Sequence, residues 1–182
     1  MTSKKETKRF VAFLRGINVG GHHKVPMADL KQLMSTLKFD NVVTILNSGN
    51  IIFDAETDNT ENLQTTISGN LEKTFGFPVP TIVRSAETIL ELYQKAPFQD
   101  VEVTKDIRLY VSFLRQDKKP DHEVPWTSPD GSFNIIESND RIILSILDLS
   151  VSKTPKAMEA LEKFYEKKNI TTRNWKTIER IV

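Results

Sequence analysis

The chain has 182 residues, 38% of them hydrophobic and 27% charged, a balance typical of a folded domain and not of a disordered or membrane chain. Its 25 basic and 24 acidic side chains give a net charge of +1, so composition alone implies no bulk attraction to nucleic acid or anionic lipid. The absence of cysteine excludes thiol catalysis, thiolate metal sites and disulfides.

The amino terminus carries lysines and an arginine before the apolar run Phe10–Leu14, which Arg15 ends. That run is shorter than the ~7–15 apolar residues of a secretory signal core, and no stretch approaches the ~20 residues of a membrane helix. We therefore expect a cytoplasmic protein without a membrane partner, in which residues 1–9 form a flexible basic tail.

Strand and helix signals alternate through the first half of the chain. We expect a strand at 10–14, a helix at 26–38, and strands at 42–46 and 51–53. Pro26 stands where a first helical residue is favourable, and Asn47-Ser-Gly-Asn50 is a tight-turn sequence between the two later strands.

A second helix is expected to begin at a capping box of Asp58 and Glu61 and to end at Gly76. Residues 79–83 fit an edge strand, because Pro80 has no N–H to donate to a central ladder. The resulting order, βαββαβ, predicts an α+β fold with a ferredoxin-like (split βαβ) antiparallel sheet.

The second half resembles an imperfect copy of the first. Val11-Ala-Phe-Leu-Arg15 reappears as Val111-Ser-Phe-Leu-Arg115, and Ser138-Asn-Asp-Arg141 stands before an apolar pair as the first turn does. The polar connection at 116–131 has no amphipathic helix pattern, which is why the copy is imperfect. Similar hairpins at matching places nevertheless favour an internal duplication.

The expected domain organisation follows from this repeat. After the tail come a ferredoxin-like half at 10–84, a linking helix and loop at 85–105, and a second ferredoxin-like half at 106–182 with a carboxy-terminal helix. Ser85 is expected to cap the linking helix, and Thr154-Pro155 to open a helix in the second half.

The first strand is apolar at every position from Phe10 to Leu14. A ferredoxin-like sheet has helices on one face only, so its other face should carry polar residues if water covered it. We therefore expect the second half or a partner chain, as in a homodimer, to cover that face. This pattern argues against an open sheet that reads RNA through aromatic residues.

The topology brings two polar segments to one sheet edge. A crossover makes the first two strands parallel, so the loop after the first strand, Arg15–Lys24, and the turn Asn47–Asn50 should lie side by side. The helix start at Pro26 adds free backbone N–H groups and a partial positive charge. Arginine, lysine, histidine and flexible glycine backbone at a helix amino terminus are typical of an anion site.

A purely structural interpretation of this loop stays open, because glycines also permit left-handed turns and asparagines also fold hairpins. Gly16–Gly21 has the gap of a phosphate-binding Walker loop, but His22 and His23 stand where that motif needs lysine and a hydroxyl. The two histidines are adjacent and would point apart, so no metal site is expected. They are the best acid–base candidates if the protein is an enzyme, and this question stays open.

The carboxyl end, from Thr171 to Thr177, predicts a short extended piece that enters a final helix. Trp175 and Ile178 should pack inward, with Arg173 at the junction. Arg173 is either an anion clamp or the salt-bridged neighbour of a tryptophan anchor.

Three motifs resemble one family, the domain of unknown function 1697, which is mainly bacterial. They are Leu-Arg-Gly-Ile-Asn-Val-Gly-Gly with Lys-Val-Pro-Met within 14–27, Leu-Asn-Ser-Gly-Asn at 46–50, and Thr-Thr-Arg-Asn-Trp-Lys-Thr at 171–177. The resemblance implies paired ferredoxin-like units and gives the motif residues no role. Its pattern has asparagine where His23 stands, which weakens the case for a catalytic histidine there.

We therefore hypothesise a protein that binds a small anionic or phosphorylated ligand, without a cofactor and with catalytic residues unknown. The alternatives are an enzyme of unknown reaction that uses the same loop, and an oligomerising or nucleic-acid-associated module. The expected ligand-binding residues are Arg15, Gly16, Asn18, Gly20, Gly21, His22, Lys24, Asn47, Ser48, Asn50, Arg173 and Asn174.

Overall fold

The structure is a computed structural model that describes residues 6–152 and 156–182, with the side chains of 156–158 left out. It has a mixed α+β fold with two antiparallel sheets. The chain divides into a first unit, Met1–Leu92 with Ile181–Val182, and a second unit, Tyr93–Arg180. Part of the predicted tail and the predicted helix start at Thr154-Pro155 lie outside the described residues.

The elements of the first unit follow the predicted order. They are β1 (Lys8–Leu14), α1 (Met27–Thr36), β2 (Asp40–Ile45), β3 (Asn50–Ala55), α2 (Thr60–Phe75) and β4 (Thr81–Ser85), followed by α3 (Ala86–Gln94). The strands are ordered β2-β3-β1-β4, and each neighbouring pair is antiparallel. β4 is an edge strand that begins directly after Pro80, as its missing N–H predicts.

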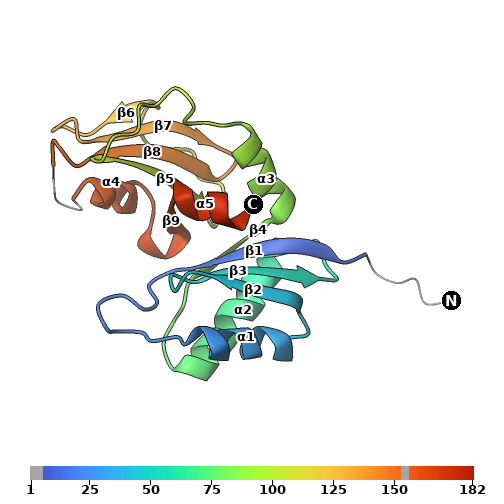
Figure 1. Ribbon diagram of the computed structural model, residues 1–182. Coiled ribbons are helices and arrows are strands. Elements are labelled where there is room, and N and C mark those ends of the chain that lie inside the picture. The colour runs from blue at the N-terminus through green and yellow to red at the C-terminus, as the bar shows by residue number, and fades with distance from the viewer. Residues whose placement is uncertain (1–5, 153–155) are drawn as a thin grey trace. The chain divides into compact units, whose positions relative to one another are not determined.

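The core of the first unit lies between one face of this sheet and the helices α1 and α2 (Figure 1). Phe10 and Leu14 of β1 pack there with Leu30 of α1 and Ile67 of α2. The alternate β1 residues, such as Phe13, are also fully buried. Buried side chains therefore occur at consecutive positions of β1, on both sides of the strand.

The ends of these elements differ from the predictions by one or two residues. β1 begins at Lys8, inside the segment predicted as a tail, because its register with β3 continues to Lys8 opposite Ala55. Pro26 is the residue before α1 and not its first helical residue. The cap of α2 is Asn59 instead of Asp58, since the Asn59 side chain accepts from the N–H of Asn62 at 3.0 Å.

The second unit is built on the other sheet, in the order β6-β7-β8-β5-β9. Its elements are β5 (Ile107–Leu114), β6 (Trp126–Thr127), β7 (Phe133–Asn139), β8 (Ile142–Asp148), α4 (Lys156–Phe164), the 3-10 turn η1 (Lys167–Asn169), β9 (Ile170–Asn174) and α5 (Trp175–Ile181). Phe133, Ile143 and Leu161 lie in one core, between the sheet and α4. The connection from β5 to β7 contains the short strand β6 in place of a helix.

An ion pair that the sequence did not predict joins β1 to β3. Arg9 and Asp54 face each other in the register, and the Arg9 guanidinium donates to both carboxylate oxygens, at 2.8 and 3.1 Å. The Asn41 amide also donates to Asp54, at 2.7 Å. Hydrogen bonds from Arg9, and more weakly from Asn41, hold the pKa of the Asp54 carboxyl below its usual 3.8 despite its partial burial.

Replacing Asp54 with asparagine is expected to lower the free energy of unfolding at neutral pH by about 1 kcal/mol, because the Arg9 side chain is largely exposed and solvent screens the pair. The lowered pKa makes the contribution of Asp54 complete well above pH 3.8 and lost as the pH falls through the folded-state value. The difference between wild type and Asp54→Asn should therefore shrink in urea denaturation below about pH 4. The control is Asp58→Asn at an exposed position; an equal effect there would contradict this prediction.

Candidate functional site

The loop after β1 and the turn after β2 lie at one edge of the first sheet, as the topology predicts. We call residues Arg15–Lys24 the glycine loop and residues Asn47–Asn50 the hairpin turn. The backbone N–H of Leu14 donates to the carbonyl of Gly49 at 2.8 Å. The side-chain amide of Asn18 donates to the carbonyl of Asn47 at 2.8 Å. These bonds confirm that two segments some thirty residues apart form one surface.

Asn18 holds the glycine loop together. Its side-chain amide also donates to the carbonyl of Val25 at 3.0 Å, and its side-chain oxygen accepts from the N–H of Val25 at 2.8 Å. Its own backbone N–H donates to the carbonyl of His23 at 3.1 Å. The residue adopts φ of 54°, a left-handed conformation that asparagine tolerates better than most residues. Asn18 therefore supports the frame of the loop, and both of its amide hydrogens are used.

The tip of the glycine loop is a tight hairpin. The N–H of His22 donates to the carbonyl of Val19 at 3.0 Å, and the two residues form an antiparallel bridge. Gly20 and Gly21 between them have φ of 60° and 77°, the positive values that a two-residue hairpin turn of type I′ requires. This geometry differs from a Walker loop, which wraps its backbone N–H groups around a phosphate.

The two histidines of the loop have different surroundings. The ring of His23 stacks on Phe77, with centroids 4.4 Å apart and an interplanar angle of 18°, and its Nδ1 lies 3.3 Å from the carbonyl oxygen of Gly16. His22 is exposed at the hairpin tip, and Lys24 is exposed where the chain leaves it. All three residues from His22 to Lys24 are exposed. The ring of His23 packs on Phe77, whereas His22 and Lys24 have no such ring contact in the described structure.

Arg15 and Gly16 form the base of the loop. The backbone N–H of Arg15 donates to the carbonyl of Pro80 at 2.9 Å, so β4 fixes the point where the loop leaves the sheet. Gly16 has φ of 75°, and no atom lies within 4 Å of the position that a β-carbon would occupy there. Arg15 is half-buried.

The hairpin turn packs closely against the start of the glycine loop. A β-carbon on Gly49, whose φ is 82°, would lie 2.7 Å from Cβ of Leu14 and 2.8 Å from Cδ1 of Ile17. Asn50 is fully buried and donates to the carbonyl of Ile45 at 2.8 Å and to the hydroxyl of Ser48 at 3.0 Å. Gly49 is the residue in this turn that only glycine can fill, and the list of predicted site residues missed it.

The start of α1 adds backbone donors beside the loop. α1 begins at Met27 after Pro26, and no side chain caps its amino terminus. The first N–H groups of a helix have no partner within the helix and carry a partial positive charge. Asp29 lies in the first turn and offsets part of that charge.

Arg173 and Asn174 belong to the second unit, on β9. Arg173 is buried and donates from Nη1 to the hydroxyl of Thr171 at 2.8 Å and to the carbonyl of Thr172 at 3.0 Å. The side chain of Asn174 accepts from the N–H of Lys176 at 3.0 Å, at the start of α5. Trp175 is buried, as predicted, with its ring 5.2 Å from that of Phe98.

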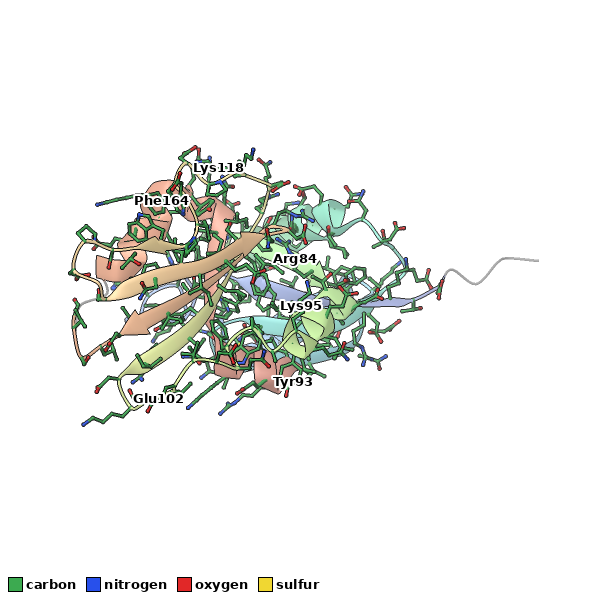
Figure 2. All side chains as sticks on the ribbon, turned by 90° about the horizontal axis from the view of Figure 1, so that it is seen from above. Arg84, Tyr93, Lys95, Glu102, Lys118 and Phe164 are labelled. Carbon is green, nitrogen blue, oxygen red and sulfur yellow. The ribbon has the colours of Figure 1, made fainter. Side chains whose placement is uncertain are left out.

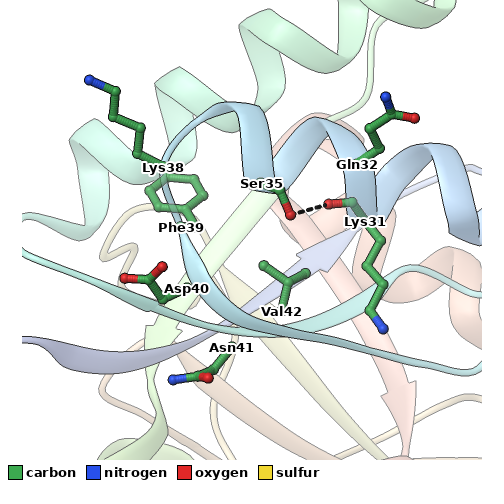
Figure 3. Close-up of a pocket in the computed structure, with 8 residues that line it drawn as sticks. All are labelled: Lys31, Gln32, Ser35, Lys38, Phe39, Asp40, Asn41 and Val42. Carbon is green, nitrogen blue, oxygen red and sulfur yellow. Dashed lines mark hydrogen bonds between the residues drawn. The ribbon is translucent and has the colours of Figure 1, made fainter.

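A surface hollow lies between the end of α1 and the start of β2. Figure 3 shows the side chains that line it: Lys31, Gln32, Ser35, Lys38, Phe39, Asp40, Asn41 and Val42. Lys31 and Lys38 extend away from each other in this view, so their charges do not converge on one point. Since β1 and β2 are parallel, the hollow and the glycine loop lie at opposite ends of these strands. The hollow contains none of the predicted site residues.

Two further features bear on the kind of site. Within residues 6–152 and 156–182, no group of three or more histidine, aspartate and glutamate side chains is placed to hold a metal ion. No helix in the described part of the chain is long and apolar enough to cross a membrane.

Comparisons with known proteins identify relatives but no activity. Residues 7–131 match the family described as Protein of unknown function (DUF1697). The motif at 171–177 lies outside that match. No curated protein matches the chain.

The solved structures that match this chain include the following two. A conserved bacterial protein from Streptococcus pneumoniae is 25% identical, with 97% of each chain covered and a TM-score of 0.75. An unknown protein from Galdieria sulphuraria is 13% identical, with 93% of this chain and 98% of the other covered and a TM-score of 0.29.

Proposed function

Because this chain belongs to the DUF1697 family, whose description states no function, we propose from the site alone that it binds a small anionic or phosphorylated ligand. The binding surface would be the edge formed by the glycine loop and the hairpin turn. The observation that carries this proposal is the arrangement of Arg15, His22 and Lys24 on one loop, which hydrogen bonds from Asn18 and Arg15 join to Asn47 and Pro80.

A fixed backbone matters because binding an anion with long side chains costs conformational entropy. Asn18 fixes the loop, and the exposed groups of His22 and Lys24 then project from a surface that does not need to order itself. The uncapped start of α1 contributes N–H groups close by in sequence. Because the tip of the loop is a tight hairpin, its backbone does not wrap around a phosphate. Recognition of an anion would therefore depend on these side chains.

The fold assignment is also a proposal at its finer level. We propose that the first unit is ferredoxin-like and that the second is a duplicated copy of it. Strand order supports this, since β7-β8-β5-β9 repeats β2-β3-β1-β4. Equivalent backbone bonds recur as well: Leu114 donates to Arg141 as Leu14 does to Gly49, and Arg115 donates to Asn169 as Arg15 does to Pro80.

The wider assignments rest on the sequence alone. A cytoplasmic location and a bacterial source stay predictions, and so does the possibility of a homodimer. No observation on the described residues favours an enzyme or a nucleic-acid-associated module over ligand binding.

A thermal-shift screen tests the binding proposal. Inorganic phosphate, pyrophosphate, nucleoside phosphates, sugar phosphates and di- and tricarboxylates are the probes. At least one probe is expected to raise the melting temperature of the wild type, and Lys24→Ala should reduce the apparent affinity about 10-fold or more, since a charge-assisted bond contributes roughly 1.5–3 kcal/mol. Arg15→Ala should have a similar or larger effect.

The control is Lys31→Ala, which removes the same charge from an exposed position on α1. It should leave the affinity unchanged at constant ionic strength. If every probe that binds wild type also binds Lys24→Ala and Arg15→Ala equally well, the glycine loop is not the anion site.

A further inference from the structure

The connection from β5 to β7 in the second unit is fastened to the end of α4. Lys118 donates from Nζ to the carbonyl of Phe164 at 2.8 Å (Figure 2). The ring of Trp126 meets that of Phe164 edge-on, with centroids 5.1 Å apart and an interplanar angle of 89°. Residues 116–128, which we call the connection, are thus held by one helix end and by the short pairing of β6 with β7.

His122 lies at the centre of these contacts. Its ring stacks on Phe164, with centroids 4.0 Å apart and an interplanar angle of 22°. Trp126 and Tyr165 present ring edges to it, at 6.1 and 6.5 Å. Both ring nitrogens are shielded from solvent, and neither has a hydrogen-bond partner among the residues that the structure describes. A neutral imidazole leaves one N–H donor unmatched here, and an imidazolium would leave two.

Burial of His122 opposes its protonation more strongly than its charged neighbour favours it. Asp121, next along the chain, favours the imidazolium, but burial has the larger effect and lowers the pKa of His122 below its usual 6.5. The Lys118 ammonium lies 3.5 Å from Asp121 and 5.8 Å from the centre of the Tyr165 ring. Burial raises the pKa of the Tyr165 phenol, so this group stays neutral when the pH falls.

We propose that the connection is an acid-sensitive latch, closed on the end of α4 while the His122 ring is neutral and opened when that ring gains a proton. The proton adds a charge and a second N–H donor inside a cluster of aromatic rings, where neither ring nitrogen of His122 has a hydrogen-bond acceptor among the described residues. Opening would let the imidazolium reach water and would expose the rings of Trp126 and Phe164.

The direction and size of the pH effect follow from linkage. The closed state holds fewer protons than the open state, so its stability is complete above pH 6.5 and is lost as the pH falls below that value. Between the open-state and closed-state pKa values, the ratio of closed to open molecules should fall about tenfold per pH unit.

Two measurements on the full chain test the latch. The chain has only three histidines, so NMR resolves the His122 ring resonance for a pH titration. Hydrogen exchange of the amides across the connection, corrected for the intrinsic rate, reports its opening. We expect the NMR titration of His122 to have its midpoint below pH 6.5. The protection of the connection's amides against exchange should be constant above pH 7 and should fall about tenfold per pH unit below the open-state pKa.

His122→Phe is the matched variant, because it keeps a flat ring on Phe164 and cannot be protonated. Protection of the connection in this variant should not vary between pH 7 and pH 5, while the amides of β5 and β8 stay protected in both proteins. A His122 midpoint at or above 6.5, weak protection of the connection at pH 7, or the same acid loss in His122→Phe would each overturn the proposal.

Discussion

Gly49→Ala is expected to lower the free energy of unfolding by roughly 2–5 kcal/mol, the sum of an overpacking cost and a left-handed backbone cost. The added methyl group would lie 2.7 Å from Cβ of Leu14, an atom fixed to the backbone of β1. Cδ1 of Ile17, 2.8 Å away, is the end of a side chain and can move, but Cβ of Leu14 cannot move without its backbone, so β1 or the hairpin turn must shift. Urea denaturation followed by circular dichroism measures the loss.

Gly16→Ala is the matched control for this substitution. Gly16 also has a positive φ, of 75°, but no atom lies within 4 Å of its expected β-carbon. It should therefore show only the backbone cost, about 1 kcal/mol. If Gly49→Ala and Gly16→Ala destabilise the protein equally, the close approach of the turn to Leu14 does not contribute.

Asn18→Ala is expected to lower the free energy of unfolding by roughly 2–3 kcal/mol, at about 1 kcal/mol for each lost side-chain hydrogen bond. Three such bonds join Asn18 to Val25 and Asn47. Their loss also frees the glycine loop from the hairpin turn, so the affinity for any anion that stabilises the wild type should fall. Urea denaturation and the thermal-shift assay measure the two effects.

Asn18→Gly separates the hydrogen bonds from the backbone conformation. Glycine adopts the φ of 54° found at this position without strain but lacks the amide. We expect Asn18→Gly to remain destabilised by most of the amount seen for Asn18→Ala. If Asn18→Gly were as stable as the wild type, the three side-chain hydrogen bonds of Asn18 would make no net contribution to the free energy of unfolding.

Local signals in the sequence predict most of the fold of the first unit. The apolar run of β1, the helical spacing before Gly76 and the missing N–H of Pro80 each act within a few residues. Parallel placement of β1 and β2 then follows from topology rules, and it predicts that the glycine loop lies against the hairpin turn.

The predictions from sequence were wrong or incomplete in two situations. Either two neighbouring residues could form the same local structure, or a residue far away in the sequence determines the contact. Asp58 and Asn59 can both cap a helix, and the structure uses Asn59. Asp54 within β3 gave no signal of an ion pair, because its partner Arg9 is set by strand register and not by spacing along the chain. The connection with β6 likewise depends on contacts with α4 that no periodicity predicts.

The site shows the same division between local and long-range information. Residue types predict an anion site, but only the geometry separates residues that form the frame from residues that face solvent. Asn18, Gly49 and Asn50 form the frame, through bonds and close contacts within the first unit. His22 and Lys24 are exposed and Arg15 is half-buried, and these three are the groups that we expect to contact a ligand.

Mapping of backbone amide shifts by NMR is the most direct test of this site. The probe is whichever phosphate or carboxylate stabilises the wild type, or pyrophosphate if several do. We predict that the shift changes concentrate at residues 15–24, 47–50 and the first turn of α1, and that Lys24→Ala needs about 10-fold more probe or higher still to reach the same changes. Changes centred on the hollow at Lys31–Val42, or a response spread evenly over both units, would contradict the assignment of the glycine loop as the binding site.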